Sequence, residues 1–163
     1  MALTKITGEG VGTLNVPAFL AKMSGNQDIT SATDTKVQFD TEVYDTDGKY
    51  DHATNYRFTP GVAGTYFLYA QVHGLGGTNS QIVDMFVFIK KNGSSLYATR
   101  HNPSSNYANQ ITLGVQVTDV ANTTDYYEMF CYINDISGNP DIDAADSSRG
   151  TLSYFGAYKL IGV

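Results

Sequence analysis

The sequence predicts an all-β fold, an antiparallel β-sandwich of about ten strands. Short runs of alternating apolar and polar residues recur along the chain, separated by clusters of Gly, Pro, Asn and Asp. The chain contains 12 Tyr, 8 Phe and 16 Gly but no Trp, a composition rich in strand-forming and turn-forming residues. No window has the periodicity of an amphipathic helix.

Length and charge limit the possible functions. The 163 residues correspond to one domain, and the net charge of −6 argues against nucleic acid binding, because affinity for phosphate requires clustered Lys and Arg. Only 16% of the residues are charged, which favours a protein that buries part of its surface in an oligomer. No segment approaches the roughly 20 apolar residues of a membrane span, so we expect no membrane contact.

Residues 1–15 are predicted to form an extended arm, and residues 16–163 the folded domain. The arm has glycine at positions 8, 10 and 12 and no clean periodicity. Its apolar residues, which suit contact with another protein, are Leu3, Ile6, Val11 and Leu14. A partly disordered terminus is the alternative. The arm lacks the continuous apolar core of a secretory signal, so we expect a protein that is not secreted.

The first strand is predicted at residues 17–23, with Phe19 and Ala21 on one face. Residues 36–44 form a second strand region. The D-x-D-G sequence at residues 45–48 favours a hairpin turn after it, because the later glutamate and flanking helices of an EF-hand calcium loop are missing.

The middle of the chain alternates between turns and apolar strands. A Pro60-Gly61 turn precedes residues 65–72, which are apolar on both faces and so should be covered on both sides. Residues 82–90 repeat this pattern, and Asn92-Gly93 predicts a tight hairpin turn after them. After a short strand and an Asn-rich loop, residues 110–120 alternate as a half-exposed strand.

The last third contains strands at residues 126–133 and 151–161, separated by the polar segment 134–150. This segment exceeds an ordinary connection, so it is predicted to be a functional or a mobile loop. We favour the interpretation that this segment is a solvated acidic loop. We therefore expect the protein to bind no cofactor. The alternative is a Ca²⁺ site, whose ligands would be Asp141, Asp143 and Asp146.

No residue is predicted to be catalytic. The lone Cys131 lies in an apolar strand pattern, which indicates a buried thiol. The three histidines share no ligand spacing, and the Gly-x-Ser-x-Gly motif of a nucleophile elbow is missing. We therefore expect a protein that is not an enzyme.

Several blocks of the chain, in order, resemble the globular head of C1q/TNF-like proteins. The central block, Phe58-Thr59-Pro60-Gly61 followed by Gly64-Thr65-Tyr66, is similar to the family's F-T-x-P-x-x-G-x-Y signature. The other blocks are residues 17–21, 36–40, 90–93, 125–133 and 153–160. In one departure, the family's terminal F-S-G-F reads Tyr154-Phe155-Gly156-Ala157 here.

This resemblance covers residues 16–163 and implies a jelly-roll sandwich that packs as a compact homotrimer, with aromatic strand residues facing the three-fold axis. On strands that are apolar on both faces, the residues that we expect at the trimer contact are Phe86, Phe88, Tyr154 and Tyr158. The alternative is a sandwich whose second faces are covered by its own loops.

The opening MALTKI is similar to the openings of bacteriophage virion proteins. We therefore expect a surface protein of a tailed-phage virion, made in the bacterial cytoplasm. As a decoration or cement protein, its arm would bind the major capsid protein or another virion protein. The alternative is a fibre tip that recognises a host glycan; the absence of a repetitive shaft favours decoration, and a bacterial lectin-like module is a third possibility. The glycan-binding loop of a fibre tip would contain Asn106, Tyr107 and Asn109.

Overall fold

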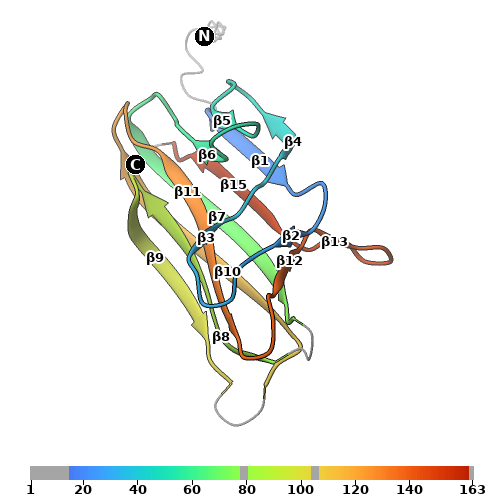
Figure 1. Cartoon of the computed structure of the whole chain (residues 1–163). Coiled ribbons are helices and arrows are strands. Elements are labelled where there is room, and N and C mark those ends of the chain that lie inside the picture. Colours follow the sequence, from blue (N-terminus) through green and yellow to red (C-terminus); the bar gives the residue numbers. More distant parts are fainter. Residues whose placement is uncertain (1–14, 78–80, 104–106, 162–163) are drawn as a thin grey trace, which may run out of the picture.

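Two antiparallel β-sheets packed face to face make up the protein (Figure 1). The computed structural model describes residues 15–77, 81–103 and 107–161, and in these ranges it contains fifteen strands and no helix. It follows that no membrane-spanning helix occurs in them. The predicted all-β sandwich is confirmed. The structure has more strands than the roughly ten that the sequence predicts, because several of its strands are only two residues long.

Each sheet is built from long strands with short ones at its margins. The first sheet has the order β2-β12-β7-β15-β1-β4, with β10 also paired to β7. Its strands are β1 (Ala18–Lys22), β2 (Gln27–Asp28), β4 (Thr41–Asp45), β7 (Gly64–Leu75), β10 (Gln110–Ala121), β12 (Asp141–Asp143) and β15 (Tyr154–Lys159). The second sheet has the order β5-β6-β11-β8-β9, with β3 also paired to β11. Its strands are β3 (Thr35–Lys36), β5 (Tyr50–Asp51), β6 (Arg57–Phe58), β8 (Ile82–Lys91), β9 (Ser94–His101) and β11 (Tyr127–Asp135). Strands β13 (Ala145–Asp146) and β14 (Gly150–Thr151) form a separate pair.

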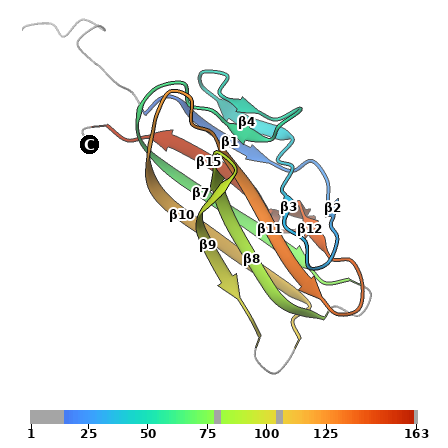
Figure 2. The same ribbon diagram turned by 60° about the vertical axis from the view of Figure 1, so that its left-hand side comes forward.

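Alternating side chains from both sheets fill the core. On β10, Ile111, Leu113 and Val115 are buried while the residues between them are exposed, which confirms the predicted alternation. The residues that face them across the register of β7 are Gly74, Val72 and Ala70. Figure 2 shows β7, β10 and β15 in one layer and β8, β9 and β11 in the other. The inward residues of these two layers make one continuous core.

Aromatic rings join the two sheets at the end where β1 lies. Phe19 of β1 stacks on Tyr50 of β5 at 4.5 Å between ring centroids and on Phe58 of β6 at 4.6 Å. Phe155 of β15 contacts the Phe19 ring edge-on at 5.0 Å. All four side chains are buried. Such pairs add about 0.5–1.5 kcal/mol each beyond their buried area, so this cluster ties the first strand to the second sheet.

The Asn92-Gly93 hairpin between β8 and β9 forms as predicted. Both residues have positive φ, 52° and 81°, as a two-residue type I′ turn requires. The Asn92 side chain also donates to Asp125 Oδ1 at 2.8 Å and accepts from the backbone N–H of Tyr126 at 3.0 Å. The turn is thereby fastened to the residues that precede β11.

The predicted strand at residues 36–44 is wrong, and so is the hairpin after it. Residues 35–36 belong to the second sheet as β3, whereas residues 41–45 belong to the first sheet as β4. The chain crosses between the sheets in between, with Val37 and Phe39 buried. The turn at residues 45–48 does form, with Gly48 at φ 61°. It connects β4 to β5 of the other sheet and is therefore not a hairpin.

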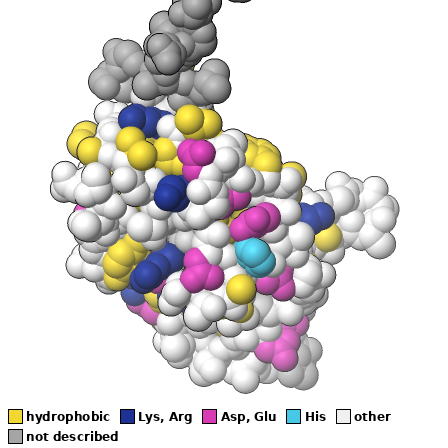
Figure 3. Space-filling model, turned by 90° about the horizontal axis from the view of Figure 1, so that it is seen from above, with side chains coloured by type: hydrophobic (Ala, Val, Ile, Leu, Met, Phe, Trp, Pro, Cys, Tyr) yellow, Lys and Arg dark blue, Asp and Glu magenta, His cyan; other side chains and the backbone are white. Residues whose placement is uncertain are grey.

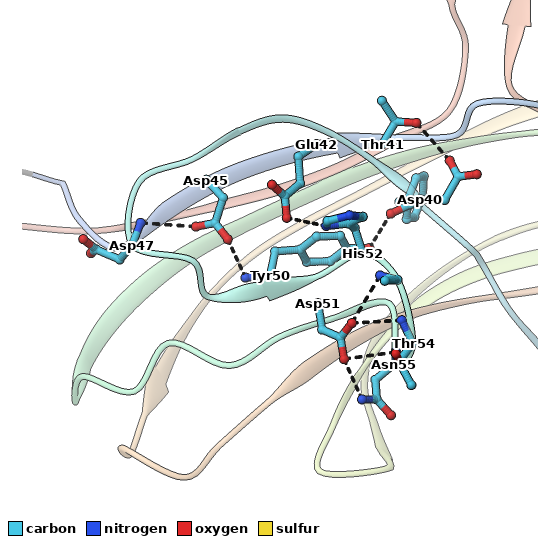
Figure 4. A network of polar contacts seen from close by, with 12 residues as sticks. Asp40, Thr41, Glu42, Asp45, Asp47, Tyr50, Asp51, His52, Thr54 and Asn55 are labelled. Carbon is cyan, nitrogen blue, oxygen red and sulfur yellow. Dashed lines mark hydrogen bonds and ion pairs between the residues drawn. The ribbon is translucent and has the colours of Figure 1, made fainter.

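The polar stretch after β4 is held by carboxylates that accept backbone hydrogen bonds (Figure 4). Asp45 Oδ2 accepts from the backbone N–H of Tyr50 at 2.7 Å. The Asp51 carboxylate accepts from the backbone N–H of Thr54 at 2.9 Å and from the side-chain amide of Asn55 at 2.6 Å. These hydrogen bonds lower the pKa of Asp51 and keep the loop in place above the aromatic cluster.

The segment 134–150 is not the extended loop that its composition predicts. It contributes β12, which pairs with both β7 and β2. Ile142 at the centre of β12 is fully buried, and Ala144 is also buried. One buried Ile between two aspartates leaves too short a pattern for a strand to be recognised from the sequence.

Candidate assembly and binding surfaces

The outer surface of the first sheet carries a cluster of aromatic side chains. Phe67 and Tyr69 lie on β7, opposite its buried residues, and Tyr154 and Tyr158 lie on the neighbouring β15. The ring centroids of Phe67 and Tyr158 are 5.5 Å apart, and those of Tyr69 and Tyr154 are 6.3 Å apart. We call these four residues the aromatic face. The rings contact one another side by side and remain partly open to solvent.

A glycine on β15 makes room for the centre of the aromatic face. Gly156 lies opposite Tyr69 in the β7–β15 register. A Cβ atom at position 156 would lie 2.4 Å from Cζ of Tyr69, a distance that real Cβ atoms do not reach. The Tyr69 ring therefore lies across the bare backbone of β15. Its burial, together with a hydrogen bond with Tyr44, raises the pKa of Tyr69.

The aromatic face continues into an apolar hollow toward β1 and β4. The hollow has a volume of 590 Å³ and is lined by Leu20, Lys22, Val43, Tyr69, Thr151 and Tyr154. Val43 and Tyr44 of β4 are exposed to 54% and 43%. Large exposed apolar side chains beside an aromatic cluster mark a surface suited to contact with another protein.

The outer surface of the second sheet is also aromatic, but its rings are covered by cations. We call Phe86, Phe88, Phe130 and Tyr132, from β8 and β11, the cation–aromatic face. Lys90 Nζ lies 3.9 Å from the centroid of Phe130, and Arg100 Cζ lies 4.9 Å from that of Phe86. Cation–π contacts of this kind contribute about 0.5–1 kcal/mol at exposed sites.

The predicted trimer-contact residues are divided between these two surfaces. Tyr154 and Tyr158 belong to the aromatic face, whereas Phe86 and Phe88 belong to the cation–aromatic face on the opposite side of the sandwich. Strand alternation indicates which residues of one strand share a face. It does not indicate which sheet the strand joins, so the sequence alone could not separate the two pairs.

A polar cluster at one end of the first sheet was not predicted. His73 Nδ1 is 2.7 Å from the Thr112 hydroxyl, and His73 Nε2 is 4.0 Å from Asp143 Oδ2. Asp143 Oδ1 accepts from the Asn26 side chain at 2.6 Å, and its backbone carbonyl accepts from the Ser153 hydroxyl at 2.6 Å. These contacts fasten β12 to β7. The residues are far apart in the sequence, and only strand register brings them together.

The three calcium candidates do not converge. Asp141 lies beside Asp28; burial and this negative neighbour raise the pKa of Asp141. Asp143 faces Asn26 and His73, while Asp146 accepts from the hydroxyl and backbone N–H of Ser148. Within residues 15–77, 81–103 and 107–161, no group of three or more His, Cys, Asp or Glu side chains has the geometry to hold a metal ion.

Other predicted residues lie at or beyond the limits of the described chain. The arm residues Leu3, Ile6, Val11 and Leu14, together with Asn106 of the ligand loop, lie outside it. Tyr107 is 53% exposed, and the backbone carbonyl of Asn109 accepts from Gly76 at 2.8 Å. Cys131 is buried, as predicted, and burial raises the pKa of its thiol.

One end of the sandwich has a mixed surface. Seen from above, basic, acidic and hydrophobic side chains are interspersed on the described part of this end (Figure 3). His52 Nδ1 contacts Glu42 Oε1 here at 2.6 Å (Figure 4).

The sequence profile of the C1q domain matches residues 18–121. This match spans more than half of the 163 residues, and the chain therefore belongs to the C1q domain family. A comparison with curated protein sequences finds no match. Domains of the C1q/TNF class are generally non-enzymatic binding modules.

Solved structures of this class share the fold. The structure of Eiger TNF from S. frugiperda superimposes with a TM-score of 0.59 at 10% sequence identity. The match covers 90% of this chain and 93% of the Eiger chain. Murine APRIL at pH 5.0 has a TM-score of 0.60 at 14% identity, with coverages of 88% and 98%. The globular domain of the zebrafish complement 1qA protein has a TM-score of 0.54 at 15% identity, with coverages of 89% and 97%. The jelly-roll topology implied by the sequence blocks is thus confirmed.

Proposed function

We propose that this chain is a non-enzymatic binding head that assembles into a homotrimer through its aromatic face and decorates the surface of a phage virion. The observation that carries the assembly step is the contrast between the two outer surfaces. The rings of Phe67, Tyr69, Tyr154 and Tyr158 contact one another, and Tyr69 and Tyr154 also line the 590 Å³ hollow. Burying the four rings gains apolar contact without removing a charged group from water, and the long Lys22 side chain at the hollow can keep its ammonium group in solvent.

The cation–aromatic face is less suited to the trimer contact. Burying Phe86 or Phe130 against another subunit would also desolvate Arg100 or Lys90, at a cost that the contact must offset. Ring closure adds that the two faces cannot both form the three-fold contact. A three-fold contact joins two different patches of each subunit, and patches on opposite sides of one sandwich produce a stack that does not close. One outer surface therefore faces the axis, and the other stays outside.

Family membership supports the oligomeric state. Domains of the C1q/TNF class are typically homotrimers. A trimer placed on the aromatic face also explains the low charge content of 16%, because part of the uncharged surface is removed from water.

The virion setting rests on the sequence. The opening MALTKI is similar to the openings of phage virion proteins, and Gly8, Gly10 and Gly12 allow the arm to follow another protein's surface. In this proposal the arm binds the major capsid protein or another virion protein, and the head projects from the shell. The protein is then made in the bacterial cytoplasm and ends at the virion surface.

Sedimentation of the full chain at micromolar concentration tests the assembly step. We expect a species of three times 17.7 kDa. Tyr158→Asp should dissociate it, because a buried unpaired carboxylate costs several kcal/mol. Phe86→Asp is the matched control on the opposite face and should remain trimeric. A monomeric wild type contradicts the proposal, and dissociation by Phe86→Asp alone would place the contact on the other sheet.

A further inference from the structure

A hollow on the cation–aromatic face has the features of a small-molecule site. Its volume is 320 Å³, and its lining residues are Asp34, Phe86, Phe88, Ser95, Ala98 and Tyr132. Ala98 of β9 lies opposite Phe88 in the β8–β9 register. Because the alanine side chain is small, it leaves an unfilled space beside the Phe88 ring, and this space is part of the hollow.

The walls of the hollow combine ring faces with ring edges. Phe86 and Tyr132 have centroids 5.8 Å apart and planes inclined at 82°, so one presents its edge to the face of the other. Two perpendicular rings offer an incoming ligand both a π face and an aromatic edge. An aliphatic C–H surface of a ligand packs well against such walls.

The charges around the hollow compensate one another. Lys90 Nζ lies 3.8 Å from Asp34, and Arg100 is bound to Asp84 through two hydrogen bonds of 2.8 and 2.9 Å. Lys36 is likewise paired with Glu128 at 2.5 Å. Among the described residues, these three cations are each paired with a carboxylate, so their charges balance. Charge complementarity favours an uncharged ligand over an acidic or a basic one.

Polar groups stand at the rim of this apolar floor. The Asp34 side chain is 54% exposed and has one cation nearby, so its carboxylate retains capacity to accept further hydrogen bonds. Ser95 and Tyr132, which both carry a hydroxyl group, also line the hollow. Acceptors and donors thus surround an aromatic floor, as in sites that orient a small polar ligand.

We propose that this hollow binds one or two units of a neutral oligosaccharide. A pyranose has an apolar C–H face, which would pack on Phe86 and Tyr132, and a rim of hydroxyl groups, which would bond to Asp34, Ser95 and the Tyr132 hydroxyl. A flat protein partner fits less well, because the Lys90–Asp34 and Arg100–Asp84 ion pairs lie beside the rings of Phe130 and Phe86 and interrupt the apolar area. The site lies on the sheet opposite the aromatic face and does not depend on the proposed trimer.

Saturation-transfer NMR on the full chain tests this site. The probes are maltohexaose, cellohexaose and chitohexaose, with a heparin hexasaccharide as the acidic comparison. We expect transfer to the ring protons of at least one neutral probe and none to heparin. Asp34→Asn, which removes a charged acceptor, and Ala98→Leu, which fills the hollow, should each weaken binding about tenfold, the equivalent of one good contact.

The control is Tyr107→Ala, which removes an exposed aromatic ring from the predicted ligand loop and should leave binding unchanged. Thermal unfolding of each variant verifies that it remains folded. The proposal is overturned by the absence of transfer to all three neutral probes, or by transfer to heparin alone. It is also overturned if binding resists Asp34→Asn and Ala98→Leu, or if only Tyr107→Ala abolishes it, because the ligand would then bind the loop.

Discussion

The Tyr69 ring can pack on β15 only because residue 156 is a glycine. In Gly156→Ala the new methyl group would overlap the Tyr69 ring at 2.4 Å, so the ring must swing away from β15. We expect a folded protein that is about 1–3 kcal/mol less stable, the usual cost of overpacking, with weakened self-association. Urea unfolding and sedimentation measure the two effects.

Removal of the clashing ring provides the control for this change. In a Tyr69→Leu background the shorter side chain leaves space, and Gly156→Ala should then cost much less than in the wild type. Equal costs in both backgrounds would mean that Tyr69 and position 156 do not interact. In that case, the lack of a side chain at position 156 is not what makes room for the Tyr69 ring.

Asp125 links the stability of the protein to acid pH. The backbone N–H of Asn122, the Asn92 side chain and Lys91 lower the pKa of Asp125 to about 2. Since the pKa of Asp125 is lower in the folded than in the unfolded state, the ionised group stabilises the fold above about pH 4. This contribution is lost as the pH falls through about 2.

Asp125→Asn should therefore reduce the free energy of unfolding by about 1–2 kcal/mol at neutral pH. The difference from the wild type should shrink as the pH falls from about 4 to about 2. Denaturant unfolding at several pH values measures it, with Asp47→Asn in an exposed turn as the control. A difference that stays constant over this range would show that the charge of Asp125 is not the stabilising feature.

At the scale of elements, the long strands were predictable and the short ones were not. Strands β7, β8, β10 and β11 are nine or more residues long, long enough for an apolar strand pattern to be recognised, and the positive-φ turn at Asn92-Gly93 has its own sequence signal. By contrast β3, β5 and β6 are two residues long, too short for any periodicity. Their placement depends on which sheet offers a free edge.

The same limit explains what sequence reasoning missed about the surfaces. The sequence pattern identified strands that are apolar on both faces, and the outward faces of these strands form the aromatic face and the cation–aromatic face. It could not assign Phe86 and Tyr158 to different sheets, because sheet membership follows from non-local pairing. It also missed Asp34, Ser95 and Ala98, whose positions around one hollow follow from the β8–β9 register and from the approach to β3.

We expect the three-residue strand β12 to anchor the segment 134–150 to the first sheet. Ile142 is fully buried between β7 and β2, so Ile142→Ala should cost about 2–4 kcal/mol. Amide exchange in residues 141–143 should also accelerate more than in β10. Ile136→Ala, at a position that is 55% exposed in the same segment, should change stability by less than about 0.5 kcal/mol. Equal effects of the two changes would refute the anchoring role of Ile142.

At the scale of the whole molecule, the two outer surfaces divide the functions that we propose. The aromatic face, which consists of four uncharged rings, would suit permanent burial between subunits. The cation–aromatic face, with each cation paired to a carboxylate, suits permanent contact with water and a small ligand. A trimer built on the first surface leaves three copies of the second one outside, so that weak single-site binding becomes multivalent.

The arm provides the test of the virion setting. In the proposed attachment, Leu3, Ile6, Val11 and Leu14 would supply apolar contacts, and the glycines at positions 8, 10 and 12 would let the backbone follow a foreign surface. Ordering a segment of the chain on a partner costs conformational entropy, so we expect each arm alone to bind weakly. Three arms on one trimer raise the effective concentration of the second and third after the first has bound.

Deletion of residues 2–14 should therefore leave a folded trimer that no longer binds phage shells, measured by co-sedimentation with shells that lack the protein. A full-length variant with the four apolar arm residues changed to serine is the matched control. It should lose binding as well, because it keeps the length of the arm but not its contacts. If either protein still occupies shells at the wild-type level, the attachment surface lies on the head. The arm would then have no part in decoration, even though the trimer and the sugar site would be unaffected.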